Sequence, residues 1–417
     1  MLSYLSSSPG IGGEIKKTPE DFLVEEIMQD GTVLEAGKSF SRQSSDGDFT
    51  HFVMEKKNWN TIQAVGALSK KCGCGKKRFS YAGNKDRRAL TTQLCSAWRV
   101  PPEQLLSLKV KDIEVNGAWV SEKKVSLGGL LGNRFTLRVK GVSEDATEKV
   151  ARIERELEGV FPNYFGSQRF GSVRANTHLV GEHIVRGSFE DAVWEYLCFI
   201  EPSEMQEARE ARERLLDEKD FSAALEYFPK HLKYERTLLG HLSARPRDFV
   251  GAMRKLPRGL ALLFVHSYQS SLFNKLLDKR VKERDFSVEE GGFYCPANEF
   301  GFPEPAKTKR ASLQEAGMVN ELVSVGKAFP CARIVGWETK DLTDSEKQSL
   351  EEEGIAQADF RVKPFPEIGS KGSARSLTCP LKDFSFDCEG DDGLFRFSLP
   401  SGSYATVALR EFLDKKD

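Results

Sequence analysis

Two segments far apart in the chain alternate apolar and polar residues, and each alternation predicts a half-buried strand. The segments are 134–140 and 393–399. Successive side chains of a strand point to opposite faces of a sheet, so the apolar members of each segment would share one buried face. These members are Phe135, Leu137, Val139, Phe395, Phe397 and Leu399.

Helical spacing of apolar residues follows the first of these strands. Ser143 is a candidate N-cap and Gly159 a candidate stop, with four apolar residues between them on one face. These four are Ala146, Val150, Ile153 and Leu157. Asn60 can cap a shorter helix earlier in the chain. The apolar face of that helix would carry Ile62, Val65 and Leu68.

The middle of the chain, from about Ser172 to about Arg361, is more helical and more acidic than its ends. A long helical stretch begins after 257–259, and turn-forming residues at 289–298 break the pattern. Strand signals then return, and a last helix is expected near Ala405. Strand-bearing ends around a helical middle predict an α+β fold in which one domain is inserted into another. The outer domain would hold a mixed or antiparallel sheet with helices on one side.

Length and composition are consistent with two globular domains. The chain has 417 residues, of which 29 % are charged, and it contains no apolar run of about 18 residues. Its first residues lack the layout of a secretory signal. Eight scattered cysteines favour reduced thiols over a disulfide framework. We therefore expect a soluble cytoplasmic protein with no membrane partner and no evident obligate protein partner.

Charge is distributed unevenly, although the net charge is only −1. The window 70–88 holds eight positive residues and a single acid, Asp86. Neighbouring cations keep such a carboxylate ionised, and they also attract a polyanion. The alternative reading is a solvated basic face in which Asp86 is a local ion-pair partner. The acidic stretch 201–220, with eight acids and four bases, is expected to be a solvated helix face with local ion pairs.

A sequence motif favours chemistry on RNA. The segment 81–93 reads YAGNKDRRALTTQ. It closely resembles the signature of the TruD family of tRNA pseudouridine synthases, in the long form found in archaea and eukaryotes, and the catalytic residue of that family is the Asp of this signature. Further segments are similar to the family in its order along the chain. They are 15–27, 127–135, 162–171 and 403–406.

The resemblance implies both a domain plan and a reaction. A discontinuous catalytic pseudouridine-synthase domain would span 1–171 and 362–417, with a family-specific insertion domain at 172–361. The chain would isomerise uridine to pseudouridine in RNA, with tRNA as partner, uridine 13 as the usual target and other RNAs left open. Asp86 would be the catalytic residue. The reaction imports no group and oxidises nothing, so no cofactor is expected.

The resemblance also implies the residues that bind the substrate, which are Phe165, Asn163, Phe22, Lys16 and Lys85. An aromatic ring can stack on a base, and an amide can bond to a base edge or orient a carboxylate. Lys16 and Lys85 would hold a backbone phosphate or the carboxylate itself. Without the resemblance, Phe165 would be assigned to an apolar core. The RNA-binding residues expected from the basic window are Lys70, Lys71, Lys76, Lys77, Arg78, Arg87 and Arg88.

Other motifs are weaker. The segment 31–39 resembles a phosphate-binding loop but has five residues between its glycines instead of four. Cys72 and Cys74 lack further ligands at zinc-finger spacing, so no metal site is expected and a surface turn is favoured. Two other functions remain open: a non-catalytic RNA-binding protein, in which Asp86 would be dispensable, and an RNA methyl transferase, which would need a glycine-rich cofactor loop not found here.

Overall fold

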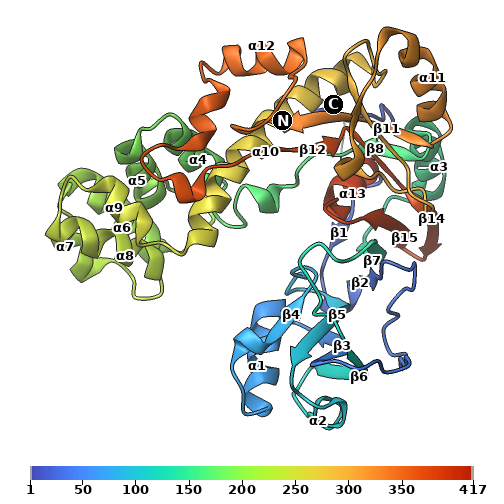
Figure 1. The fold of residues 1–417 in the computed structure, drawn as a ribbon, viewed down its shortest axis with the longest axis horizontal. Coiled ribbons are helices and arrows are strands. Elements are labelled where there is room, and N and C mark those ends of the chain that lie inside the picture. Colours follow the sequence, from blue (N-terminus) through green and yellow to red (C-terminus); the bar gives the residue numbers. More distant parts are fainter. Residues whose placement is uncertain (1, 415–417) are drawn as a thin grey trace. The chain divides into compact units, whose positions relative to one another are not determined.

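The computed structural model describes residues 2–414, and the chain folds into two compact units. The sheet unit comprises Tyr4–Phe161, Asn298–Phe302 and the C-terminal segment from Cys379. The helical unit comprises Pro162–Ala297 and Pro303–Thr378, together with the first residues. Figure 1 shows the elements of both units. The boundaries expected from the sequence, at 171/172 and 361/362, fall inside the helical unit, and the expected division into two functional domains stays a prediction.

Strands from both ends of the chain form the main sheet of the sheet unit. Over the described residues it is nine-stranded, in the order β14-β15-β7-β2-β5-β3-β6, with β1 beside β7 and β4 beside β5. β2 and β5 run parallel, and the other pairs are antiparallel. The sequence left a mixed or an antiparallel sheet open, and the parallel pair of β2 and β5 makes it a mixed one. The strands are β1 Glu14–Ile15, β2 Phe22–Ile27, β3 Phe49–Lys57, β4 Phe79–Tyr81, β5 Leu90–Trp98, β6 Ile113–Ser121, β7 Gly132–Lys140, β14 Lys382–Glu389 and β15 Asp392–Pro400. A separate pair is β8 Val160–Pro162 and β13 Thr378–Pro380.

The two strands predicted from alternation are β7 and β15, and they lie side by side. In their antiparallel register Phe397 is opposite Phe135, and Phe395 is opposite Leu137. All six apolar residues expected on their shared face are buried. The sheet therefore joins segments more than 250 positions apart in the sequence through one apolar face.

Four helices of the sheet unit pack on this sheet: α1 Thr61–Lys71, α2 Pro102–Leu106, α3 Ala146–Leu157 and α13 Ala405–Leu413. The four apolar residues predicted for α3 are all buried, which confirms the stripe. Its N-cap is Asp145, however, and not Ser143. Asn60 caps α1 as predicted, its side chain accepting from the Gln63 amide at 2.8 Å. Ile62 was expected inside but is 54 % exposed.

The helical unit is built around a long helix, α10 (Arg258–Glu283). Phe264, Tyr268, Leu272 and Leu276 recur along it at four-residue spacing; the first three are buried and Leu276 is half-buried. Gly181 of α4 lies against this helix, and a Cβ there would come within 2.0 Å of the Phe264 carbonyl oxygen, so the close packing of α4 on α10 requires glycine. The other helices are α4 Thr177–Val185, α5 Phe189–Cys198, α6 Gln206–Glu218, α7 Phe221–Tyr227, α8 Lys233–Ala244, α9 Phe249–Arg254, α11 Leu313–Ser324 and α12 Asp344–Glu352. A small sheet in the order β10-β9-β11-β12 completes the unit, with strands β9 Phe293–Pro296, β10 Lys309–Arg310, β11 Ala328–Ile334 and β12 Ser373–Ser376.

The acidic stretch 201–220 is not a fully solvated helix face, which corrects the sequence prediction. The Arg212 side chain of α6 is fully buried. Its guanidinium pairs with Glu204 at 2.9 Å and with Glu235 of α8 at 3.1 Å. Arg174 also pairs with Glu235, at 3.0 Å. Two of the paired residues, Arg174 and Glu235, lie outside the stretch, so its local charge pattern gave no sign of this buried cluster.

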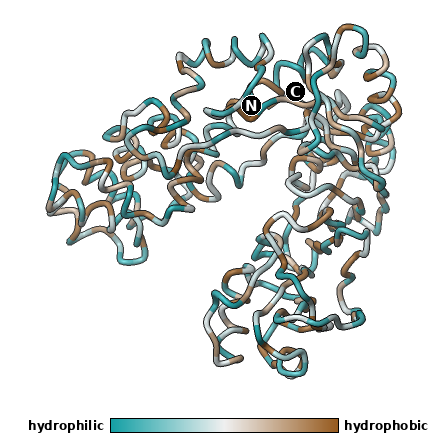
Figure 2. The backbone as a smooth tube through the Cα atoms, in the orientation of Figure 1, coloured by the Kyte–Doolittle hydropathy of each residue, from teal (hydrophilic) through white to brown (hydrophobic). Residues whose placement is uncertain are grey.

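Hydropathy along the backbone agrees with this architecture. Figure 2 shows hydrophobic and hydrophilic positions interleaved along the helices and strands, without a long uninterrupted hydrophobic run. Among residues 2–414, no helix has both the length and the apolar character needed to cross a membrane.

Candidate active site

Asp86 lies in the loop 82–89, which connects β4 to β5. The register places Tyr81 opposite Cys95 and Leu90 beside Leu23 of β2, so the loop begins and ends next to well-paired strands. The Asp86 side chain is 33 % exposed. A carboxylate at this position is open to solvent while its main chain is held by the sheet.

Lys16 pairs directly with this carboxylate. Its Nζ lies 2.6 Å from Asp86 Oδ2, and the same ammonium is 4.0 Å from the centroid of the Phe22 ring. Lys16 has a φ of +58°, an uncommon conformation for a non-glycine residue and one that concentrates at functional sites. Phe22 is itself buried and packs edge-on against Phe135. The structure therefore brings Asp86, Lys16 and Phe22 together, with one Phe22 ring face beside the Lys16 ammonium.

Lys85 has different partners from those expected. Its side chain is 6 % exposed and its Nζ lies 3.0 Å from Glu26 Oε2, with Asn133 Oδ1 as a second acceptor. The Lys85 amide donates to Thr61 Oγ1 at 2.9 Å. In this structure the Lys85 ammonium is thus paired inside the unit with a carboxylate of β2, and its expected role at the substrate stays a prediction.

Gln93 and Lys56 also hold the loop. Gln93 is the last residue of the motif 81–93, whereas the sequence analysis did not single out Lys56. Gln93 Nε2 donates to the Gly83 carbonyl at 3.1 Å. Lys56 is 1 % exposed, and its Nζ donates to the carbonyls of Trp59 at 2.6 Å and Asp86 at 3.0 Å. Burial lowers the pKa of Lys56 to about 8, against the attraction of Asp86. The period-two pattern contained a signal for this lysine, because residue 56 falls on the same strand face as the buried residues 52 and 54.

The basic window lies on and after α1. Its lysines at 70, 71, 76 and 77 are exposed, as are Arg87 and Arg88, and within residues 2–414 no carboxylate pairs with any of the six. Arg78 is different, because its guanidinium donates to the carbonyls of Trp98, at 2.6 Å, and Arg99. Five of the seven residues expected to bind RNA are therefore open to a ligand. Arg78 is engaged in holding the end of β5, and Arg88 donates to the Lys17 carbonyl at 3.1 Å.

Salt dependence of tRNA binding tests these lysines. Replacing Lys70, Lys71, Lys76 and Lys77 with alanine should weaken tRNA binding. It should also flatten the slope of log affinity against log salt, by about 0.7–0.9 for each phosphate that is no longer neutralised. The control replaces four lysines that already pair with acids in the helical unit, namely Lys279, Lys282, Lys307 and Lys347. An equal slope change in both variants would show that the window has no special role.

Asn163 and Phe165 belong to the helical unit. Asn163 is buried, and its Nδ2 donates to Ser376 Oγ at 3.0 Å while its Oδ1 accepts from Arg375 at 2.6 Å. The Arg375 guanidinium lies 4.1 Å from the centroid of the Phe165 ring. Asn274 of α10 holds the Phe165 main chain through two hydrogen bonds, at 2.8 and 3.0 Å. The structure thus groups Asn163 with Phe165 and adds Arg375, which the sequence pattern did not single out.

Phe165 is 8 % exposed, and the Phe273 ring meets it edge-on at 5.6 Å. Both a packing role and a substrate-binding role are compatible with this geometry. The assignment of Phe165 and Asn163 to the substrate therefore stays a prediction.

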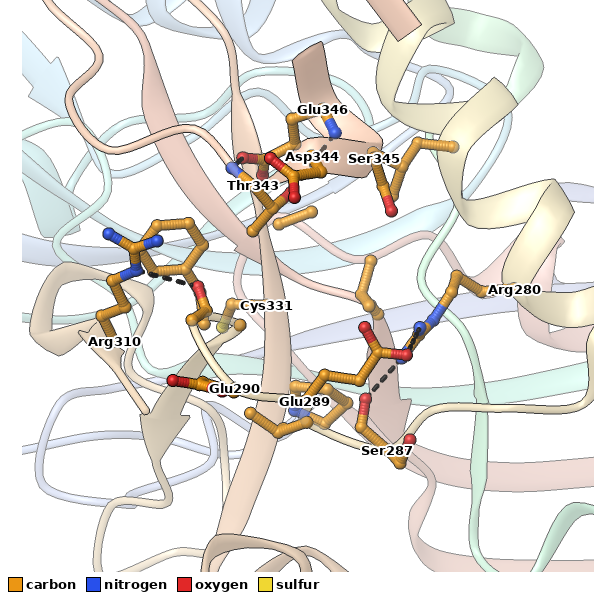
Figure 3. Close-up of a pocket in the computed structure, with 18 residues that line it drawn as sticks. Arg280, Ser287, Glu289, Glu290, Arg310, Cys331, Thr343, Asp344, Ser345 and Glu346 are labelled. Atoms are coloured by element: carbon orange, nitrogen blue, oxygen red, sulfur yellow. Dashed lines mark hydrogen bonds and ion pairs between the residues drawn. The ribbon is translucent and has the colours of Figure 1, made fainter. Parts of the chain in front are cut away.

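A cavity of about 170 Å³ in the helical unit offers a different kind of site (Figure 3). Arg280 and Arg310 line it together with the acids Glu289, Glu290 and Asp344. Mixed charge of this kind does not favour a phosphate, and none of the described residues expected in the site from the sequence lines the cavity. In residues 2–414 no cluster of His, Cys, Asp or Glu is arranged to hold a metal ion.

Comparisons with known proteins identify the family. The sequence model of tRNA pseudouridine synthase D (TruD) matches residues 1–412. A relative from Methanosarcina mazei, named probable tRNA pseudouridine synthase D, is 35 % identical, covering 98 % of this chain and 95 % of its own. A relative of the same name from Archaeoglobus fulgidus is 36 % identical, with 98 % and 97 % covered. The crystal structure of the putative TruD from Methanosarcina mazei superposes with a TM-score of 0.80 at 33 % identity, covering 99 % of this chain and 95 % of that one. The chain belongs to the tRNA pseudouridine synthase D family.

Proposed function

We propose that this chain isomerises uridine to pseudouridine in tRNA, with uridine 13 as its target and Asp86 as its catalytic group. The observation that carries the proposal is the Asp86 carboxylate, one third exposed and paired with Lys16 at 2.6 Å, in a loop that follows a set of exposed surface cations. Family membership supports the reaction class. The proposed place of action is the cytoplasm.

The chemistry needs a carboxylate and no cofactor. The N1–C1′ bond of the nucleotide breaks, the freed base rotates, C5 bonds to C1′ as the C5 proton leaves, and N1 takes up a proton. Asp86 would either attack the nucleotide covalently or assist removal of that proton. Lys16 holds this carboxylate through an ion pair at 2.6 Å. Attack at C1′, attack at C6 and a glycal-type intermediate are all compatible with this arrangement.

The proposed division of labour follows the domain plan of the resemblance. Residues 1–171 and 362–417 would form the catalytic domain and 172–361 the insertion domain. The exposed cations of 70–88 would follow the RNA backbone, and extruding the target base would cost a few kcal/mol.

The direct test maps pseudouridine in tRNA. Purified protein is incubated with unmodified tRNA and no added cofactor, and each position is read by reverse transcription after carbodiimide treatment. The expected product is a single pseudouridine at position 13. Pseudouridine only at other positions would support the proposed reaction but contradict uridine 13 as its target. Absence of pseudouridine with intact tRNA binding would favour the non-catalytic alternative.

Phe165 has two competing roles that one variant pair separates. As a base-stacking ring it should tolerate Phe165→Tyr, which keeps the aromatic face, while Phe165→Ala should lower kcat far more than tRNA affinity. As a packing residue it should make Phe165→Ala destabilising by about 3–5 kcal/mol. Thermal melting is measured first. A large fall in Tm, with activity lost only in proportion to the unfolded protein, would show that Phe165 is a packing residue and does not stack on the base.

A further inference from the structure

Lys56 is a buried cation directly beneath the Asp86 main chain. Its strand, β3, lies next to β5 in the sheet, and its side chain passes through the interior to reach the loop 82–89. Its Nζ donates to the carbonyls of Asp86 and Trp59. Within the described chain no carboxylate lies within ion-pair distance of this ammonium. A buried ammonium is costly to desolvate, so two backbone carbonyls are an unusual set of partners.

The arrangement places Asp86 between two cations that act on different parts of it. Lys16 contacts the carboxylate from the solvent side, and Lys56 contacts the carbonyl of the same residue from the interior. A hydrogen bond to this carbonyl fixes the peptide plane that follows Asp86. Fixing that plane limits the directions in which the carboxylate can point. Trp59, the second acceptor, precedes α1, so Lys56 also ties the loop to the start of that helix.

We propose that Lys56 is a positioning residue for Asp86, holding the main chain of the loop 82–89 so that the carboxylate is presented to the target nucleotide. The inference rests on the proposed function, since it assumes that Asp86 is the catalytic group. Lys56 does not touch the substrate and takes no part in bond breaking. A misplacement of a catalytic group by about 1 Å can cost around 100-fold in rate. Loss of Lys56 should therefore lower kcat without a comparable change in KM.

The adjacent residue provides a matched control. Lys57 is exposed, pairs with Glu20 at 2.5 Å, and points to the opposite face of the same strand. In the full-length protein, Lys56→Met should lower kcat for pseudouridine formation about 100-fold and leave the KM for tRNA within about threefold. Lys57→Met should leave both within about twofold. Hydrogen exchange should accelerate about tenfold in peptides covering 82–89 of the Lys56→Met protein and stay unchanged in β7.

The wild-type pH profile gives a readout that needs no variant. Burial lowers the pKa of Lys56 from its ordinary value, Asp86 and Cys95 oppose that effect, and Lys85 adds to it. The ammonium is therefore charged below about pH 8 and loses its proton as the pH rises through that value. The kcat should fall above about pH 8 with KM steady. In Lys56→Arg, whose guanidinium stays protonated, this alkaline limb should be absent.

Three results would overturn the inference. They are a kcat for Lys56→Met within about threefold of the parent, a fall in kcat with faster exchange across the whole sheet unit, and a wild-type kcat that is flat from about pH 7 to 9. These are separable from failure of the proposed function. If the wild type makes no pseudouridine, or if Asp86→Asn stays active, the proposed function itself is wrong. If both behave as expected and Lys56→Met is fully active, Lys56 alone loses its role.

Discussion

Asp86→Asn is expected to abolish pseudouridine formation, lowering kcat by at least about 1000-fold, while the protein folds and binds tRNA as before. The amide has the size of the carboxylate but neither its charge nor its nucleophilicity, and loss of a catalytic group costs orders of magnitude in rate. Stability should change little. The lost pair with Lys16 joins side chains 33 % and 18 % exposed, and partly exposed pairs contribute about 0–1 kcal/mol.

The measurement is single-turnover pseudouridine formation, with melting and tRNA affinity recorded on the same samples. Asp48→Asn is the matched control, because Asp48 is an exposed acid of the same unit paired with Arg99. Its activity should match the parent. Residual activity of Asp86→Asn within about tenfold of the parent would remove Asp86 from the catalytic role.

Arg212→Met is expected to destabilise the helical unit by about 3–5 kcal/mol, with a fall in Tm of roughly 6–20 °C. Arg212 is fully buried, and its guanidinium bonds to two carboxylates and to the Leu197 carbonyl at 2.7 Å. Methionine fills similar volume but leaves Glu204 and Glu235 with Arg174 as their remaining cation. Uncompensated buried charge dominates this cost.

The comparison for Arg212 is Arg214→Met on the same helix. Arg214 is 55 % exposed and pairs with Glu218 four residues later, a type of pair that contributes a few tenths of a kcal/mol. In thermal and urea unfolding, the loss of stability in Arg212→Met should therefore be much larger than the loss in Arg214→Met. Equal small effects would mean that Arg212 is solvated, as the acidic pattern alone predicted.

Local sequence patterns predicted where helices and strands lie better than they predicted which residues those elements contact. The α3 stripe and the strands β7 and β15 were found because spacing along one segment determines which side faces inward. Ile62 was misplaced because α1 packs through Ala64, Val65 and Leu68, and one turn of a helix cannot show where its partner surface ends. Arg212 was wrongly expected on a solvated face, because its burial depends on an ion pair with Glu235, a residue of another helix.

In the site, too, the sequence identified the reactive residues better than it identified their contacts. Asp86 and Lys16 were found from a motif and a resemblance, and the structure places them in contact. Lys85 was expected to bind the substrate. In the structure its ammonium lies inside the sheet unit, in contact with Glu26 of β2 and Asn133 of β7. Lys56 was missed since a lysine in an alternating strand is usually assigned to solvent. Its role depends on a carbonyl 30 positions away, which no sequence period reveals.

The position of β15 beside β7 also constrains the order in which the chain can fold during synthesis. The helical unit comes mainly from two neighbouring ranges, Pro162–Ala297 and Pro303–Thr378, so it can form before β14 and β15 are made. The sheet cannot be completed until β14 and β15 are made, because both strands follow the helical unit in the chain. Until they arrive, β7 presents one unpaired edge to the cell. The unit that carries Asp86 thus begins to emerge before most of the helical unit and closes after it.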